Sequence, residues 1–281
     1  MGGGLLQLVA YGAQDVYLTG NPQITFFKVV YRRHTNFSIE SIQQTFNGST
    51  GVGKRVTCQI SRNGDLVHKL YLVLINGSAI SKDGRDLIEK VEIEIGGQLI
   101  DRQYGHWMKI WNELTLPAGK KNGYETMVKD STKLYIPLEF WFCRNVGLAL
   151  PLIALQYHEV KINIEFGGSD GDFTDAELWA DYIFLDTDER RRFAQLSHEY
   201  LIEQVQFTGS ENVADGDKGK SVKLSFNHPV KELIWQRSNA STNTTSKYNT
   251  SGKAKLMLNG NDRFAERDDM YFTHVQPYQH H

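Results

Sequence analysis

The stretch KRVTCQISRNGDLVHKLYLVLING, residues 54–77, decides the fold class of this chain. Apolar residues recur in it at every second position, which is typical of β-strands with one buried face. The two apolar rows are Val56, Cys58, Ile60 and then Leu70, Leu72, Leu74. Asn63-Gly64 lies between the rows, and this dipeptide favours the positive φ angles of a two-residue hairpin turn. The stretch therefore predicts two antiparallel strands joined by a tight hairpin.

The same alternation extends outward from this stretch over most of the chain. It recurs in EKVEIEIGGQLID (89–101), KLYIPLEFWF (133–142), HEVKINIEF (158–166) and ELWADYIFL (177–185). Gly96-Gly97 predicts a second hairpin turn, and the run 133–142 predicts one continuous strand with Leu134, Ile136, Leu138, Phe140 and Phe142 on one face. Several strands separated by turns predict an all-β fold of antiparallel sheets.

Helical patterns are sparse. In YGHWMKIWNELT (104–115), Trp107, Ile110, Trp111 and Leu114 have the spacing of one helix face. In DTDERRRFAQL (186–196), acidic residues precede arginines, as the helix dipole favours. We expect this second helix to connect two β domains, because a strand pattern restarts in LIEQVQFTG (201–209).

The second half of the sequence repeats the first weakly. HKLYLVLI (68–75) is echoed by HPVKELIWQ (228–236), and VEIEIGGQLIDRQYGHWMKIW (91–111) is echoed by AKLMLNGNDRFAERDDMYFTH (254–274). Such self-similarity favours two domains of one architecture. The second copy has no counterparts of the strands at 134–142, 158–166 and 177–185, so we expect it to be incomplete.

Composition excludes several classes of protein. The 281 residues carry a net charge of -2, which favours neither nucleic acid nor anionic lipid as a partner, and we expect Arg32-Arg33-His34 to be a solvated strand end. The apolar run GLALPLIALQY (147–157) is too short to span a membrane. It is either part of the core or a patch covered by a neighbouring subunit. The two cysteines, Cys58 and Cys143, lie in apolar runs and are expected to be buried thiols.

The search for catalytic, cofactor-binding and metal-binding residues assigns none. We considered His158-Glu159 and His280-His281 as metal ligands, Asp181, Asp186, Asp188 and Glu189 as an acid–base or cation site, and Gly51, Gly53 and Lys54 as a phosphate loop. Strand ends, a frayed tail and a solvated helix cap explain the histidines and carboxylates better, and the glycines lack the strand–loop–helix context of a phosphate loop. We therefore expect no enzyme activity and no cofactor.

Six asparagines occur in Asn-x-Ser/Thr sequences: Asn36, Asn47, Asn76, Asn239, Asn243 and Asn249. The last three belong to SNASTNTTSKYNTSG (238–252), a polar, low-complexity stretch between predicted strands. We interpret it as an exposed loop whose composition creates such sequences by chance, and NGSAISKDGRDL (76–87) as another loop at one end of the sandwich. Glycosylation remains an alternative.

Three long segments resemble the major capsid proteins of nucleocytoplasmic large DNA viruses, of the giant and algal virus type. They are GGGLLQLVAYGAQDVYLTGNPQITFFKVVYRRHTNF (2–37), FWFCRNVGLALPLIALQYHEVKI (140–162) and NGNDRFAERDDMYFTHVQPYQHH (259–281). The resemblance implies two tandem jelly-roll sandwiches, with the second incomplete here. It divides the chain into an N-terminal arm (1–24), a first jelly roll (25–188) that opens with the strand ITFFKVVYRR (24–33), a connector (189–198) and the N-terminal part of a second jelly roll (199–281).

The resemblance also implies partners. Three copies would form a capsomer of pseudo-hexagonal outline, and neighbouring capsomers and minor capsid proteins would complete an icosahedral shell that assembles in the host cell cytoplasm. No direct binding to nucleic acid and no membrane span are expected. Two other functions stay open at this point: a β-sandwich module that binds glycans through its end loops, and a minor capsid or scaffold relative of the same fold.

Overall fold

The structure is a computed structural model that describes residues 12–14, 35–212, 219–236 and 252–281. The chain divides into two compact units, one formed by residues 31–207 and the other by 1–30 with 208–281. Apart from residues 12–14, the expected arm (1–24) lies outside the described residues, as do the expected opening strand (24–33), Arg32-Arg33-His34 and the asparagines at 239, 243 and 249.

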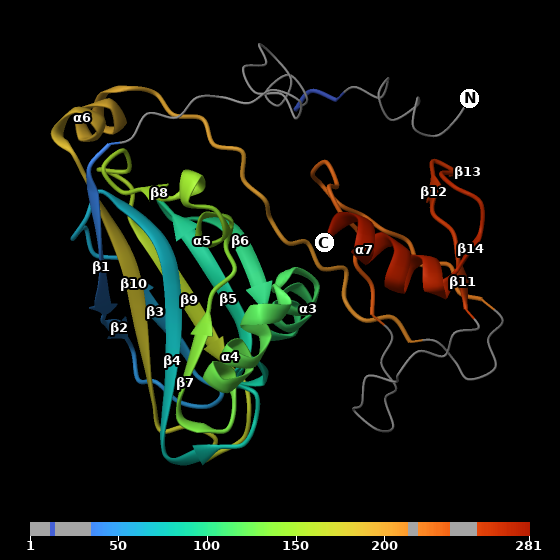
Figure 1. Ribbon diagram of the computed structural model, residues 1–281, viewed down its shortest axis with the longest axis horizontal. Helices are drawn as coiled ribbons and strands as arrows, with labels where there is room; N and C mark the ends of the chain where they lie inside the picture. The colour runs from blue at the N-terminus through green and yellow to red at the C-terminus, as the bar shows by residue number, and fades with distance from the viewer. Residues whose placement is uncertain (1–11, 15–34, 213–218, 237–251) are drawn as a thin grey trace. The chain divides into compact units, whose positions relative to one another are not determined.

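The first unit is a sandwich of two five-stranded antiparallel sheets (Figure 1). Sheet A has the order β1-β10-β4-β7, with β8 also paired to β4, and sheet B has the order β2-β3-β9-β5-β6. The strands are β1 (Phe37–Gln44), β2 (Phe46–Asn47), β3 (Arg55–Gln59), β4 (Leu66–Ile80), β5 (Ile88–Ile95), β6 (Gln98–Tyr104), β7 (Ser131–Pro137), β8 (Leu150–Pro151), β9 (Val160–Phe166) and β10 (Asp175–Leu185).

The pairing of the eight principal strands is nested. The first pairs with the last (β1 with β10), the second with the second-last (β3 with β9), then β4 with β7, and β5 with β6 at the centre of the sequence. Consecutive principal strands lie in different sheets except for β5 and β6; the short strands β2 and β8 lie in the same sheets as β3 and β7, respectively. A long antiparallel hairpin folded over in this way is a jelly roll. The predicted all-β, antiparallel class is confirmed, and the described residues hold one complete sandwich of this kind.

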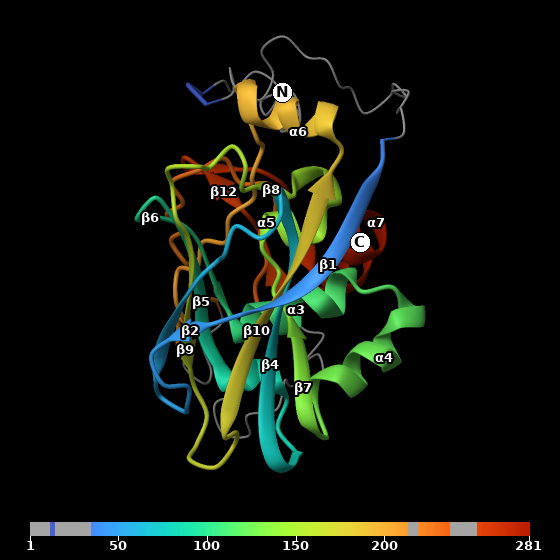
Figure 2. The same ribbon diagram turned by 90° about the vertical axis from the view of Figure 1, so that its left-hand side faces the viewer.

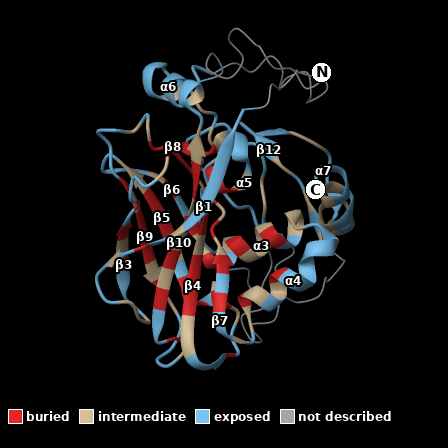
Figure 3. Cartoon of the chain, turned by 60° about the vertical axis from the view of Figure 1, so that its left-hand side comes forward, coloured by how far each residue is buried: buried red, intermediate tan, exposed pale blue. Residues whose placement is uncertain are grey.

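The core lies between the two sheets, where Figure 3 shows the buried residues. The predicted inward rows are confirmed: Val56, Cys58, Ile60, Leu70, Leu72 and Leu74 are all at most 4% exposed. Each such aliphatic side chain stabilises the folded state by roughly 1.5–3 kcal/mol relative to its exposed state. The run 147–157 contributes to this core, since Leu150 and Leu152 are buried in it. Leu150 belongs to β8, Leu152 directly follows this strand, and the short helix η2 (Val146–Leu148) before it has no buried residue.

The predicted hairpin at Asn63-Gly64 is wrong. β3 belongs to sheet B and β4 to sheet A, so the chain crosses from one sheet to the other at this point. Gly64 is required there for a different reason: a Cβ atom on it would lie 2.8 Å from the Cβ of Tyr182. The Tyr182 hydroxyl lies 2.7 Å from the Ser61 carbonyl oxygen and 3.0 Å from Gln44 Oε1, and these contacts fix the crossing against β10.

The second predicted hairpin is confirmed. Gly96 and Gly97 have φ angles of 61° and 81°, and the flanking residues Ile95 and Gln98 pair directly. Positive φ at both central residues is the requirement of a type I′ turn, whose twist matches that of the strands it joins.

The predicted strand 133–142 is only half correct. β7 ends at Pro137, which has no N–H to continue the ladder, and helix α5 (Trp141–Arg144) follows. Phe140 and Phe142 are still fully buried, with stacked rings 5.8 Å apart. The alternation therefore predicted their burial but not their backbone conformation.

Two predicted helices are confirmed, as α3 (Gly105–Thr115) and α6 (Thr187–Gln195). Asp186 caps α6 by accepting a hydrogen bond from the Thr187 backbone. Helix α4 (Ala118–Val128), with its two glycines, was not predicted. It packs beside β7 and, with α3, forms a helical hairpin between β6 and β7.

The described residues of 208–281 form little regular structure. They contain two short strand pairs, β11 (Lys253–Ala254) with β14 (Arg267–Asp268) and β12 (Met257–Leu258) with β13 (Asn261–Asp262). Helices η3 (Tyr271–Val275) and α7 (Gln276–His280) follow, and no described side chain of this part is buried. The predicted strands 201–209 and 228–236 are not formed by the described residues.

Candidate assembly surface

The carboxylates and histidines considered as a catalytic or metal site do not converge. Asp186 caps α6, Glu189 accepts a hydrogen bond from Thr35, and Glu159 pairs with Lys161. His281 pairs with Glu232, 2.7 Å away. Within the described ranges, no group of three or more His, Cys, Asp or Glu residues could hold a metal ion.

The glycine-rich segment with Gly51, Gly53 and Lys54 lies between β2 and β3 and leads into a strand rather than a helix. The Lys54 ammonium donates to the Ser49 hydroxyl at 3.0 Å. Both cysteines are buried free thiols. Burial raises the pKa of Cys58 to about 12 and also raises that of Cys143, so both are protonated at neutral pH.

The described asparagines of the Asn-x-Ser/Thr sequences differ in accessibility. Asn36 and Asn47 are exposed on or beside edge strands. The amide nitrogen of Asn76 donates to the carbonyl oxygens of Gly171 and Asp172 at 3.2 and 3.4 Å. Asn76 lies within β4, so it ties the end of this strand to the loop between β9 and β10. The predicted loop 76–87 is therefore wrong for residues 76–80, which continue β4.

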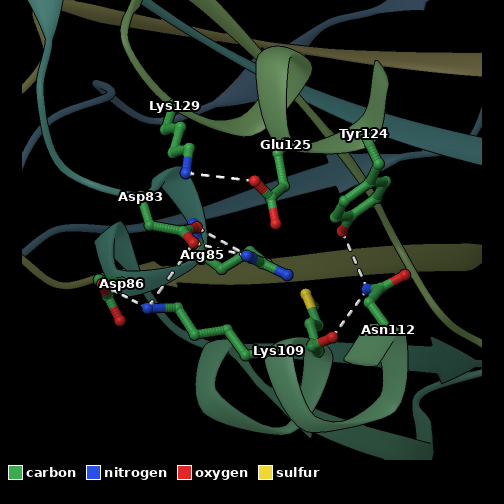
Figure 4. Close-up of polar contacts among 9 residues, drawn as sticks. Asp83, Arg85, Asp86, Lys109, Asn112, Tyr124, Glu125 and Lys129 are labelled. Atoms are coloured by element: carbon green, nitrogen blue, oxygen red, sulfur yellow. Dashed lines mark hydrogen bonds and ion pairs between the residues drawn. The ribbon is translucent and has the colours of Figure 1, made fainter. Parts of the chain in front are cut away.

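A charged cluster fixes the α3–α4 hairpin to the sandwich (Figure 4). The Arg85 guanidinium, in helix η1 (Gly84–Leu87), makes a two-pronged contact with Asp83, at 2.9 and 2.5 Å. Lys109 of α3 reaches across to Asp86 at 2.5 Å. The cluster joins the start of β5 to α3, and side chains that are only 12–18% exposed form its centre, Arg85 with Asp83.

The pKa of Asp83 reflects two opposed effects. Burial alone would raise it, but the hydrogen bonds from Arg85 and the charges of Arg85 and Lys109 outweigh burial, so the pKa lies below its usual value. The ionised carboxylate is therefore the form that the fold favours.

A second contact ties α3 to α4. The buried Asn112 amide donates to the Tyr124 hydroxyl at 2.9 Å and to the Met108 carbonyl oxygen at 2.7 Å (Figure 4). The side of α3 that the sandwich buries is marked by Gly105, Met108 and Asn112, whereas Trp107, Ile110, Trp111 and Leu114 are only partly buried. The apolar face predicted from sequence thus remains partly open on the sandwich surface.

Residues 200–207 follow the free edge of sheet B as an extended strap, which we define by these residues. The Val205 N–H donates to the Asp101 carboxylate at 2.9 Å, and Gln204 donates to the Ile100 carbonyl oxygen. The Phe207 ring meets Tyr104 edge-on at 5.3 Å. These contacts lie along β6, so the strap covers backbone groups that an edge strand would otherwise present to other chains.

Asp101 is the anchor of this strap. It is 3% exposed, and burial raises its pKa although the hydrogen bonds from Val205, Gln103 and Arg102 oppose the effect. Burial also raises the pKa of Glu139, although the charge of Arg144 opposes the effect. The Arg144 guanidinium donates to Glu203 at 3.2 Å and lies over the Trp111 ring, 4.1 Å from the ring centroid.

The opposite situation holds at β1, the edge strand of sheet A. It pairs with β10 along its whole length, yet Phe37 and Ile39 are 65% and 52% exposed. Its sequence, FSIESIQQ, has no proline or lysine of the kind that protects edge strands. An exposed apolar edge without such protection is suited to contact with another protein surface.

Among the described residues, no helix is long and apolar enough to cross a membrane.

Two sequence families match this chain in tandem. The family described as "Major capsid protein N-terminus" matches residues 25–186, and "Large eukaryotic DNA virus major capsid protein" matches residues 189–281. The first covers the sandwich and the second begins within α6.

The chain is similar to named capsid proteins over its full length. It is 59% identical to the major capsid protein of Pyramimonas orientalis virus, across all of this chain and 76% of that protein. It is 46% identical to the major capsid protein of Paramecium bursaria Chlorella virus 1, across 99% of this chain and 78% of that protein. For the Phaeocystis pouchetii virus protein, at 51% identity, the match spans 84% of this chain and 58% of the relative.

Solved structures of viral capsid proteins are similar to this chain in fold. A subunit of the quasi-atomic PBCV-1 virus capsid superposes with a TM-score of 0.76 at 39% sequence identity, over 91% of this chain and 77% of that chain. The Faustovirus major capsid protein, at 10% identity and a TM-score of 0.50, shares the fold alone. With a nested jelly roll, two tandem family matches and relatives of this identity, the chain belongs to the major capsid proteins of large eukaryotic DNA viruses.

Proposed function

We propose that this chain acts by self-association: three copies form a capsomer with a pseudo-hexagonal outline, and capsomers tile an icosahedral shell. One observation carries the proposal, namely that a complete jelly roll is followed in the same chain by a second copy of its central element order. In the first copy, the hairpin β5–β6 leads into α3, and in the second, the hairpin β12–β13 is followed by the short strand β14 and then by η3 and α7. Three chains with two similar units each approximate six-fold symmetry, which suits a hexagonal lattice.

The proposed domain boundaries follow from the presence of two similar units in one chain. We propose an N-terminal arm at 1–24, a first jelly roll at 25–188, a connector at 189–198 and the N-terminal part of a second jelly roll at 199–281. Supporting this division, the two family matches meet between residues 186 and 189. The strap 200–207 would then fasten the start of the second domain to β6 of the first.

Apolar side chains in 208–281 supply surface for subunit contacts. Trp235, Met257, Leu258, Met270 and Tyr278 are between 48% and 90% exposed. Soluble proteins rarely leave so many large apolar residues uncovered unless another surface packs on them. We propose that neighbouring subunits cover them, together with Phe37 and Ile39 of β1.

Further partners follow from the shell. We propose that minor capsid proteins bind the capsomers, that assembly takes place in the host cell cytoplasm, and that the chain has no catalytic role. The net charge of -2 supports a shell role without direct contact to nucleic acid, because a nucleic-acid-binding surface needs an excess of positive charge.

Measuring the mass of the purified chain in solution tests whether three copies associate. Native mass spectrometry and light scattering should give three times the 32.0 kDa of one chain, and negative-stain images should show hexagonal outlines. An Ile39→Asp variant should shift the mass toward one chain, because an exposed apolar contact becomes charged, whereas Tyr157→Asp, 94% exposed beyond β8, should not. A chain that stays monomeric at the highest soluble concentration, or a dimer, would count against the proposal.

A further inference from the structure

A shallow groove of about 350 Å³ lies on the sandwich where β1 passes into β2 beside the start of β10. Figure 2 shows the course of these three strands. Its walls come from the end of β1, the β2–β3 loop and the first residues of β10. The polar side chains that line it include Gln43, Thr45, Ser49, Thr50, Asp175 and Glu177. The subunit contacts proposed above do not use this groove, whose floor includes Phe46 and Ala176 at the margin of the core.

The lining is rich in hydroxyl, amide and carboxylate groups, and none of its described residues is basic. One oxygen of each carboxylate is already engaged: Asp175 Oδ1 accepts from Thr50 Oγ1, and Glu177 Oε2 accepts from Trp179 Nε1, both at 2.9 Å. No described residue donates to the other oxygens, Asp175 Oδ2 and Glu177 Oε1. These two acceptors are therefore oriented by the fold and remain available to donors on a ligand.

A row of rings runs from this groove across the outer face of sheet A. Trp179 lies directly opposite Gln43 on one side and Tyr71 on the other, and Tyr71 lies opposite Pro137. The neighbours of Trp179 along β10, Leu178 and Ala180, are fully buried in the core, so Trp179 stands on the opposite, outer face. Trp179, Tyr71 and Pro137 are all partly exposed.

We propose that this groove and the Trp179 ring bind a neutral saccharide. A pyranose ring presents a face of C–H groups that packs on the electron-rich face of an indole, and its hydroxyls donate to carboxylates and exchange hydrogen bonds with amides. Trp179 and Glu177 offer both contacts side by side, since the indole N–H holds the carboxylate next to the ring. The lining carries two carboxylates and no basic residue, and the Lys54 ammonium beside Ser49 offsets only part of this negative charge, so the groove disfavours sialylated or sulfated sugars because like charges repel.

The full chain, produced in bacteria so that Asn47 beside the groove carries no glycan, is tested first on an array of neutral and acidic oligosaccharides. Binding of the neutral sugars that score is then measured by saturation-transfer NMR and calorimetry. The variants are Trp179→Ala, which removes the stacking ring, and Glu177→Gln, which keeps the shape of the side chain but removes its charge. Tyr157→Ala, at an aromatic residue that is 94% exposed beyond β8 and away from the groove, is the matched control.

Neutral sugars should bind the unmodified chain and the Tyr157→Ala control equally. Affinity should fall by roughly tenfold or more in Trp179→Ala, the size expected for loss of a well-packed aromatic contact, and by a smaller factor in Glu177→Gln. Saturation transfer should be strongest at the ring C–H protons. The proposal is overturned if no neutral sugar binds, if acidic sugars bind better, or if Glu177→Gln and a folded Trp179→Ala both keep full affinity. A change of oligomeric mass in Trp179→Ala without sugar binding would assign this face to a subunit contact instead. The trimer proposal does not depend on the outcome.

Discussion

Substitution of Gly105 by alanine is the sharpest test of how the α3–α4 hairpin is seated. A Cβ atom at this position would lie 1.9 Å from the carbonyl oxygen of Arg85 and 2.4 Å from that of Ile88. Real Cβ atoms essentially never approach closer than 3.0 Å, so α3 or helix η1 would have to move by about 1 Å. Both obstacles are backbone atoms and cannot rotate away. Overpacking of this kind costs about 1–3 kcal/mol, and we expect the upper end of the range.

The matched control is Gly123→Ala on α4, where a Cβ atom would meet nothing within 4 Å. There the same substitution should stabilise the fold by about 0.5–1 kcal/mol, since alanine is the better helix former. Urea titrations followed by tryptophan fluorescence should show midpoints that move in opposite directions at an unchanged slope. If Gly105→Ala is as stable as the unsubstituted chain, the close packing of α3 against η1 is wrong.

Three further outcomes follow from individual contacts. Tyr182→Phe should lower the free energy of unfolding by about 1–2 kcal/mol in urea titrations, because the Ser61 carbonyl oxygen and Gln44 Oε1 lose the hydroxyl that donates to them; an unchanged midpoint would contradict this. Asp83 has a lowered pKa in the folded chain, so its contribution is fully present above its usual pKa of 3.8 and is lost as the pH falls through the lower folded value. Thermal unfolding at pH 7 should therefore show Asp83→Asn less stable than the unsubstituted chain because Arg85 loses its charged partner, and the gap should narrow by pH 3; a constant gap would exclude this linkage. Cys58 and Cys143 should react with a thiol reagent only as the chain unfolds, and rapid reaction of both in the native chain would show that they are not buried.

Sequence periodicity predicted which residues are buried far better than it predicted which strands pair. Val56 and Leu72 are both in the core, as their alternation indicates. Their strands nevertheless lie in opposite sheets, because Asn63-Gly64 spans the sandwich instead of closing a hairpin. Apolar residues at every second position indicate only that one face of a strand is buried. A strand in either sheet of a sandwich satisfies it equally, so the pairing partner must come from topology.

The polar sites were less accessible to prediction because their members are distant in sequence. Asp83 and Arg85 are close enough to suggest a local contact, but Lys109 joins them only because α3 begins beside η1. Gln43 and Trp179 face each other only through the register of β1 on β10, the first and last principal strands of the sandwich. Once the jelly-roll order is known, that pairing becomes predictable, and the groove beside it can be anticipated.

The two copies of the weak internal repeat show which features of a hairpin depend on local sequence and which depend on tertiary packing. Gly96-Gly97 and Asn259-Gly260 both adopt positive φ angles, and each pair closes a two-residue hairpin that precedes a helix. Turn chemistry is local, so it forms in both copies. Burial is not local: Ile95, directly before the first turn, is partly buried and packs against the core, whereas Leu258, directly before the second, is 54% exposed. The first hairpin has β9 paired beside β5 and a second sheet across the core, while among the described residues the second hairpin pairs only with itself. A hairpin alone buries too little apolar surface to be stable in water. The second copy therefore depends on surfaces outside itself for its core, and this is the physical reason to expect its order to increase on assembly. Hydrogen exchange at residues 257–262 should slow when the subunits associate, and equal exchange in free and assembled chains would show that the repeat gains no core from its neighbours.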